Sequence, residues 1–188
     1  MAIKIYIDQG HNPSGFNTGA EGNGYFEQDI TFAVGIELYA LLSENPEFIP
    51  RLSRPTPETI LGTSNNSSVT ERVREANTWG ADVFLSIHTN ASVNPAANGT
   101  EALVYSASST VAMGLAESIL TELNLVTGLR NRGIVLRPGL YVLRRTAMPS
   151  IVIELGFISN PADAELMATS PGLFALGIYR GILDYYNL

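Results

Sequence analysis

The eight residues "ADVFLSIH", Ala81 to His88, decide the fold class of this chain. They form a short, nearly continuous apolar run, which is typical of a strand buried on both faces of a sheet. The segment before it, "VTERVREANTW" at 69–79, has the polar and apolar spacing of a surface helix. A helix that leads directly into a doubly buried strand is the repeating unit of an α/β protein.

The same alternation continues in both directions along the chain. Further strands are expected at residues 3–7, 47–54, 100–106, 139–145 and 150–157. Helices are expected at about 26–45, 69–79, 109–125 and 172–188. We therefore predict a single mixed, mostly parallel sheet covered by helices on both faces, in one domain spanning residues 1–188.

Local signals refine three of these elements. Ser68 and Glu71 have the spacing of a capping box, which predicts the start of the helix at 69–79. Pro50 places the strand at 47–54 at an edge of the sheet. The segment 130–139 carries three arginines and is expected to be a solvated loop, although an arginine fork there could also hold a substrate carboxylate.

Composition excludes several classes of protein. The chain has 11 basic and 18 acidic residues, a net charge of −7, so it lacks the basic face that nucleic-acid binding requires. Cysteine is absent, which excludes a disulfide scaffold and any thiolate zinc site. The N-terminal segment has neither a basic head nor a long apolar stretch, so we expect no signal peptide in this chain and no membrane insertion.

Three polar residues stand at the carboxyl ends of expected strands, where α/β sheets bind their ligands. His11 and His88, the only two histidines, follow the first strand and end "VFLSIH". Glu154 directly follows the apolar residues 151–153, where a carboxylate is costly to bury without a partner. Taken alone, His11 reads as a turn residue and His88 as a core histidine. Their coincidence with Glu154 at one edge indicates a site.

Two histidines at one edge of a protein without cysteine suggest a metal. Two imidazoles and one carboxylate with an open position suit hydrolytic zinc. Glu27, at the start of the first helix, is the favoured carboxylate. Its competitors are Asp8, Glu21, Asp29 and Glu101. Asp8 is better placed to orient the loop, Glu21 lies in the glycine-rich segment 19–24 expected to form a rim, and Glu101 begins the next strand.

Several segments resemble the zinc-dependent N-acetylmuramoyl-L-alanine amidases of the amidase-3 family. The resemblance runs nearly end to end, and its most specific parts are "SIHTNAS" at 86–92 and "ELGFISN" at 154–160. Further matches are "DQGHNPSG" at 8–15, "GTEALVYS" at 99–106, "NRGI" at 131–134 and the run from Leu140 to Met167. The resemblance implies hydrolysis of the amide between N-acetylmuramic acid and the L-alanine of the peptidoglycan stem peptide.

The resemblance also implies one zinc ion per chain, with His11, Glu27 and His88 as ligands and Glu154 as the catalytic glutamate. Gln9 departs from the proline usual in the family, which affects the stiffness of the loop. The segment 105–119 passes directly from strand to helix, without the long insertion that forms a blocking helix in some relatives. We therefore expect no autoinhibition of that kind.

The implied partner is peptidoglycan, and we expect a monomer that acts at the cell wall after secretion or after release by lysis. Two other functions compete with this one. A wall-binding module without catalysis is expected to lose one or more of His11, His88 and Glu154, all of which are present. A zinc carboxypeptidase or aminopeptidase would use a similar site at a sheet edge.

Overall fold

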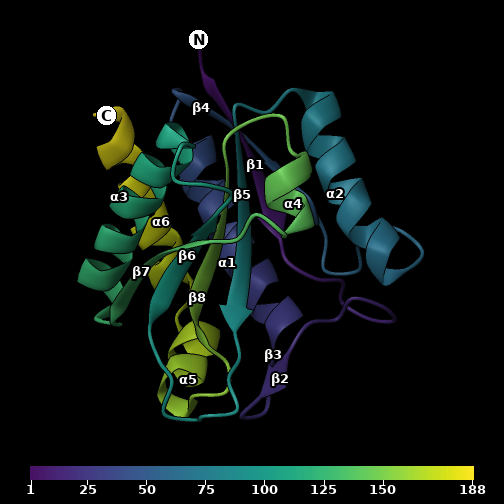
Figure 1. Cartoon of the computed structure of the whole chain (residues 1–188), viewed down its shortest axis with the longest axis vertical. Helices are drawn as coiled ribbons and strands as arrows, with labels where there is room; N and C mark the ends of the chain where they lie inside the picture. The colour runs from purple at the N-terminus through teal and green to yellow at the C-terminus, as the bar shows by residue number, and fades with distance from the viewer.

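Strand β5 (Val83–Asn90) lies inside a six-stranded sheet in the computed structural model, which describes all 188 residues. The strand order is β4-β1-β5-β8-β6-β7 (Figure 1). The other five strands are β1 (Ile3–Gln9), β4 (Phe48–Leu52), β6 (Thr100–Val104), β7 (Asn131–Leu136) and β8 (Ser150–Phe157). β4, β1, β5 and β8 run parallel, β6 is antiparallel to β8, and β7 is parallel to β6.

Helices cover both faces of this sheet (Figure 1). One layer contains α1 (Glu27–Ser43), α3 (Thr110–Thr127) and α6 (Pro171–Tyr186), and α5 (Pro161–Thr169) packs into the same core at one end. The opposite layer contains α2 (Asn65–Trp79) and the short α4 (Tyr141–Arg145). This confirms the predicted mixed α/β sheet between helical layers.

The alternation of side chains along the strands explains why both faces must be covered. In β5, Leu85 and Ile87 join the core under α1, α3 and α6, whereas Phe84 points to the α2 side and stacks on Tyr6 with ring centroids 5.6 Å apart. Successive residues of a strand face opposite sides, so a strand that is apolar at every position is stable only between two layers.

Two expectations about the second half of the chain are wrong. Residues 139–145, expected as a strand, contain the helix α4, whose Arg144 N–H donates to the carbonyl of Leu140 at 3.0 Å. The arginine-bearing segment 130–139, expected as a loop, contains β7. β7 is an edge strand that pairs only with β6, so its polar side chains stay at the surface. With that edge occupied by β7, the segment of α4 packs over the sheet through the buried Leu143.

The expected capping box at the start of α2 is also wrong. The helix begins at Asn65, and Ser64 is its N-cap, with reciprocal hydrogen bonds between Ser64 and Ser67. Ser68 lies in the first turn and is buried, and its hydroxyl accepts a hydrogen bond from Asn17 Nδ2 at 3.1 Å. The predicted edge position of the strand with Pro50 is confirmed, because β4 is the other edge of the sheet.

The small hairpin of β2 (Glu21–Gly22) and β3 (Tyr25–Phe26) follows the loop after β1 and leads into α1. It overlaps the glycine-rich segment 19–24, which is expected to form a rim. None of the helices by itself has the length and apolar character of a membrane span. α5 and α6 reach that length and composition only as a pair, and they are bent by 83°.

Candidate metal centre

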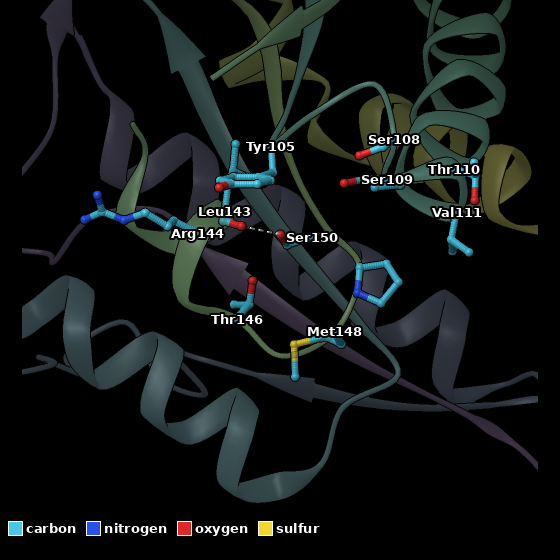
Figure 2. Close-up of a pocket in the computed structure, with 12 residues that line it drawn as sticks. Tyr105, Ser108, Ser109, Thr110, Val111, Leu143, Arg144, Thr146, Met148 and Ser150 are labelled. Atoms are coloured by element: carbon cyan, nitrogen blue, oxygen red, sulfur yellow. Dashed lines mark hydrogen bonds between the residues drawn. The ribbon is translucent and has the colours of Figure 1, made fainter. Parts of the chain in front are cut away.

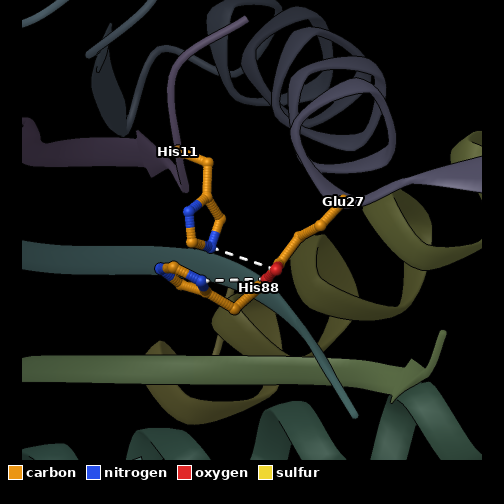
Figure 3. A group of neighbouring side chains, drawn as sticks. All are labelled: His11, Glu27 and His88. Carbon is orange, nitrogen blue, oxygen red and sulfur yellow. Dashed lines mark hydrogen bonds and ion pairs between the residues drawn. The ribbon is translucent and has the colours of Figure 1, made fainter. Parts of the chain in front are cut away.

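His11, Glu27 and His88 converge at the carboxyl edge of the sheet (Figure 3). His11 follows β1, His88 lies in β5, and Glu27 is the first residue of α1. One nitrogen or oxygen atom from each of the three lies within 4.8 Å of the other two. His11 Nε2 is 3.1 Å from one carboxylate oxygen of Glu27, and His88 Nδ1 is 3.1 Å from the other. The set predicted from the sequence is therefore brought together.

Two glycines let the backbone approach these imidazole rings. A Cβ atom on Gly10 would lie 2.6 Å from Cε1 of His88. A Cβ atom on Gly19, where φ is +86°, would lie 2.8 Å from the ring of His11 and 2.9 Å from the Glu27 carboxylate. Any larger residue at either position would occupy the space that the three side chains use.

Glu27 is held as a carboxylate by two backbone donors and by its contacts with both histidines. Backbone N–H groups of Ala20 and Thr89 donate to its two oxygens at 2.8 and 2.9 Å, in addition to the contacts with the histidines. Burial raises the pKa of Glu27, but the hydrogen bonds and charges of His11 and His88 outweigh burial and hold the pKa below its usual range. A buried, deprotonated carboxylate between two imidazoles fits a divalent cation.

The histidines are themselves oriented by neighbours. His11 Nδ1 is 3.2 Å from Asn17 Oδ1, so the tautomer that donates to Asn17 leaves Nε2 free to bind a cation. Burial lowers the pKa of His88, while the hydrogen bond and the charge of Glu27 raise it by more. The two rings meet edge to face, with centroids 4.8 Å apart.

Three of the competing carboxylates lie away from this cluster. Asp8 is buried, and it accepts hydrogen bonds from Arg72 Nη1 at 2.5 Å and from the Ser86 hydroxyl at 2.7 Å. Glu21 and Asp29 are exposed on the hairpin and on α1. The expectation that Asp8 orients the loop agrees with these contacts.

Glu154 lies next to the cluster but outside it. It is in register with His88 on β5 and with Glu101 on β6, and its Oε2 atom is buried without a hydrogen-bond partner. Burial raises the pKa of Glu154 to about 7, with further increases from the charges of Glu27 and Glu101 and an opposing decrease from His88. A carboxyl group with a pKa near neutrality is suited to accept and return a proton.

Glu101 lies at the start of a strand, as expected, and outside the cluster, but it lies closer to the cluster than that position suggests. β6 runs antiparallel to β8, so the first residues of β6 lie at the same edge as Glu154. Its carboxylate accepts hydrogen bonds from Asn90 Nδ2 at 2.8 Å and from Arg132 Nε at 3.0 Å. Glu101 and Arg132 thus form an ion pair beside Glu154. No local pattern signals the strand direction that places them there.

A separate cavity of about 510 Å³ lies between the start of α3 and α4 (Figure 2). Its lining includes Tyr105, Ser108, Arg144, Met148 and Ser150. None of the residues of the metal-ligand cluster lines it. This cavity is therefore separate from the metal-ligand cluster.

The family model described as N-acetylmuramoyl-L-alanine amidase matches residues 5–184. The amidase CwlM of Bacillus licheniformis is 35% identical over 189 residues, which cover 99% of this chain and 70% of that protein. A solved amidase from Clostridium difficile 630 superposes with a TM-score of 0.88 at 29% identity, covering 99% of this chain and 97% of that one. The CwlD amidase from Clostridioides difficile, solved in complex with the GerS lipoprotein, superposes with a TM-score of 0.89 at 26% identity and covers 98% of each chain.

Proposed function

The chain belongs to the N-acetylmuramoyl-L-alanine amidase family, and we propose that it works through one zinc ion held by His11, Glu27 and His88, with Glu154 as the proton-transferring group. As a member of this family it is a peptidoglycan hydrolase, which cleaves the amide between N-acetylmuramic acid and the L-alanine of the stem peptide. The family is metal-dependent, and the cluster supplies a suitable set of donors.

The choice of zinc rests on the chemistry of these donors. Catalytic zinc sites take three protein ligands, commonly histidine and carboxylate, and leave one position open. Nε2 of His11, Nδ1 of His88 and the carboxylate of Glu27 make such a set, and the chain has no thiolate to compete with it. When bound, zinc supplies a Lewis acid that favours ionisation of water and polarises a carbonyl group.

Glu154 performs the proton transfers in this proposal. Its carboxylate removes a proton from the water that adds to the amide carbon. It then delivers a proton to the alanine nitrogen as the C–N bond breaks, so the amine leaves in neutral form. An amine is a poor leaving group unless it is protonated, and general acid–base catalysis of this kind contributes roughly 10²–10⁴-fold. In the metal-free chain, burial raises the pKa of Glu154 to about 7, which suits a group that both accepts and returns a proton.

One observation carries the proposal: a buried carboxyl group without a hydrogen-bond partner lies beside three converging metal-ligand side chains. Incubation of the purified protein with muropeptides, followed by mass spectrometry, tests the reaction. Free stem peptide is expected. Release of terminal amino acids would indicate a carboxypeptidase or aminopeptidase, and binding to the cell wall without any product would indicate a wall-binding module.

Elemental analysis tests the metal. We expect about one zinc per chain in protein purified without chelator, and loss of zinc in His88→Ala. Full zinc occupancy in that variant would contradict the ligand assignment. We further propose that the protein acts at the cell wall as a monomer, after secretion or lysis, and light scattering of the purified chain measures its mass in solution.

A further inference from the structure

Arg72 lies under the loop that carries His11, although it comes from α2. Its side chain is buried, with 2% of the residue exposed. Nη2 donates to the backbone carbonyl of His11 at 2.6 Å, and Nη1 donates to the carbonyl of Gln9 at 2.6 Å. One guanidinium therefore holds the backbone on both sides of Gly10, at the point where β1 ends.

The backbone of His11 needs such support. Its φ angle is +71°, in the left-handed region, which costs a residue with a Cβ atom about 1 kcal/mol or more. Conformations of this kind persist only where the surroundings hold them. The hydrogen bond from Arg72 reaches the carbonyl of His11 itself, while Asn17 contacts the His11 ring.

The same guanidinium is also connected to the second histidine strand. Nη1 of Arg72 pairs with Asp8 at 2.5 Å, and the other oxygen of Asp8 accepts a hydrogen bond from the Ser86 hydroxyl at 2.7 Å. Ser86 lies two positions before His88 on β5, and it is in register with Asp8. A buried chain of three side chains therefore links α2 to β5, which carries His88, and to β1, which directly precedes the loop of His11.

We infer that Arg72 is a positioning residue for the metal centre. It sets the zinc affinity by holding the backbone of His11 directly and by holding the strand of His88 through Asp8 and Ser86. This inference rests on the proposed metal centre. Outer contacts that orient metal ligands typically change metal affinity by 10–100-fold when they are removed.

Arg54 offers a matched control. It is also buried, with 1% of the residue exposed, and like Arg72 it has an Nε atom without a partner. Its Nη1 donates to the carbonyl of Gln28 at 3.0 Å, and its guanidinium lies over the ring of Phe32. It contacts neither the histidines nor the side chain of Glu27, and the Gln28 carbonyl keeps a second donor in the Thr31 hydroxyl, so Arg54→Lys repeats the loss of a buried guanidinium without disturbing the backbone of His11.

The test compares zinc affinity with stability. The dissociation constant for zinc is measured by competition with a chromophoric chelator, and the melting temperature is measured in EDTA, for wild type, Arg72→Lys and Arg54→Lys. We expect both variants to melt at lower temperature, Arg72→Lys to bind zinc about 10–100-fold more weakly, and Arg54→Lys to bind zinc within about 3-fold of wild type.

Wild-type affinity in folded Arg72→Lys, or an equal loss in both variants, would overturn this inference and leave the metal centre standing. A wild-type chain that binds no zinc would overturn the metal centre and this inference with it. If Arg72→Lys does not fold, Asp8→Asn, which keeps the side-chain volume and weakens the ion pair, takes its place. Unchanged zinc affinity in Asp8→Asn would then overturn the inference.

Discussion

Glu27 and Glu154 are neighbouring carboxylates whose surroundings give them opposite properties. Glu27 receives two backbone N–H donors and contacts both histidines, which favours its charged form, whereas Glu154 has a buried oxygen without any partner. The pKa of the first is lowered and that of the second is raised. Such a divergence between two nearby groups supports the proposed roles, a metal ligand for Glu27 and an acid–base group for Glu154.

Changing each glutamate to glutamine should therefore affect a different property, catalysis for Glu154 and zinc binding for Glu27. Glu154→Gln keeps the shape of the side chain and removes the base, so we expect normal folding and zinc content, with kcat lower by roughly 10²-fold or more. Glu27→Gln should lose zinc affinity and regain part of its activity when zinc is added. Zinc content and muropeptide kinetics measure both. If Glu154→Gln lost its zinc while Glu27→Gln kept it, Glu154 would be the metal ligand and Glu27 the proton-transferring group.

The raised pKa of Glu154 also predicts a dependence of stability on pH in metal-free protein. At the acid end the carboxyl is protonated in both the folded and unfolded chains. Between its ordinary value of 4.5 and about 7, the unfolded chain releases a proton that the folded chain keeps. The contribution of this group to stability therefore falls as pH rises through that window, and it stays low above it.

Glu154→Gln removes this penalty. Relative to wild type, we expect the variant to gain ~1–3 kcal/mol of unfolding free energy on going from pH 4 to pH 8, since one pKa unit corresponds to about 1.4 kcal/mol. Urea denaturation in EDTA at the two pH values measures it. Glu117→Gln, on the exposed surface of α3, controls for the loss of one carboxylate. An equal difference from wild type at both pH values would contradict the prediction.

At the scale of elements, the start of α2 matters because this helix carries Arg72. The Ser64 hydroxyl caps the helix by accepting a hydrogen bond from the N–H of Ser67 at 3.2 Å. The Ser67 hydroxyl in turn accepts a hydrogen bond from the N–H of Ser64 at 2.9 Å. Glu71, which the sequence pattern assigned to the capping box, instead pairs at the surface with Arg74. Surface pairs of this kind contribute little to stability.

Ser64→Ala should lower the unfolding free energy by about 1 kcal/mol, because an unsatisfied N-cap typically costs that much. Glu71→Gln should change it by less than about 0.5 kcal/mol. Urea denaturation of both variants provides the comparison. A larger loss of unfolding free energy in Glu71→Gln than in Ser64→Ala would instead support the capping box of Ser68 and Glu71 expected from the sequence.

At the scale of the whole molecule, the connection between β6 and α3 is the segment in which a blocking helix would be inserted. β6 ends at Val104 and α3 begins at Thr110, so only five residues, 105–109, separate them. They lie at the opposite end of β6 from Glu101, beside the cavity of Figure 2. The connection supplies no blocking helix for the metal centre.

We therefore expect the purified, zinc-loaded chain to cleave muropeptides without an activator protein. The related CwlD amidase was solved with the GerS lipoprotein, so dependence on a partner is a meaningful alternative within the family. A time course of stem-peptide release, with and without added bacterial cell extract, measures whether cleavage depends on an activator. Cleavage only in the presence of extract would show that some other part of the molecule restrains the site.

The sequence by itself determined the elements whose patterns are local and strong. The doubly buried strands β1, β5 and β8 contain apolar runs, and His11, His88 and Glu154 follow these runs, so position alone indicates them as candidates. Glu27 was favoured over other carboxylates because it opens the first helix, and the structure places it between the two histidines.

Only the tertiary structure decided the rest. Segments as short as α4 and β7 have apolar patterns that fit either a helix or a strand, so packing against the sheet selects between them. The direction of β6 depends on pairing with β8, a strand far away in sequence, and that direction brings Glu101 to the metal edge. Arg72 and Asp8 are 64 positions apart. Their contact arises from folding of α2 against β1, which no local periodicity records.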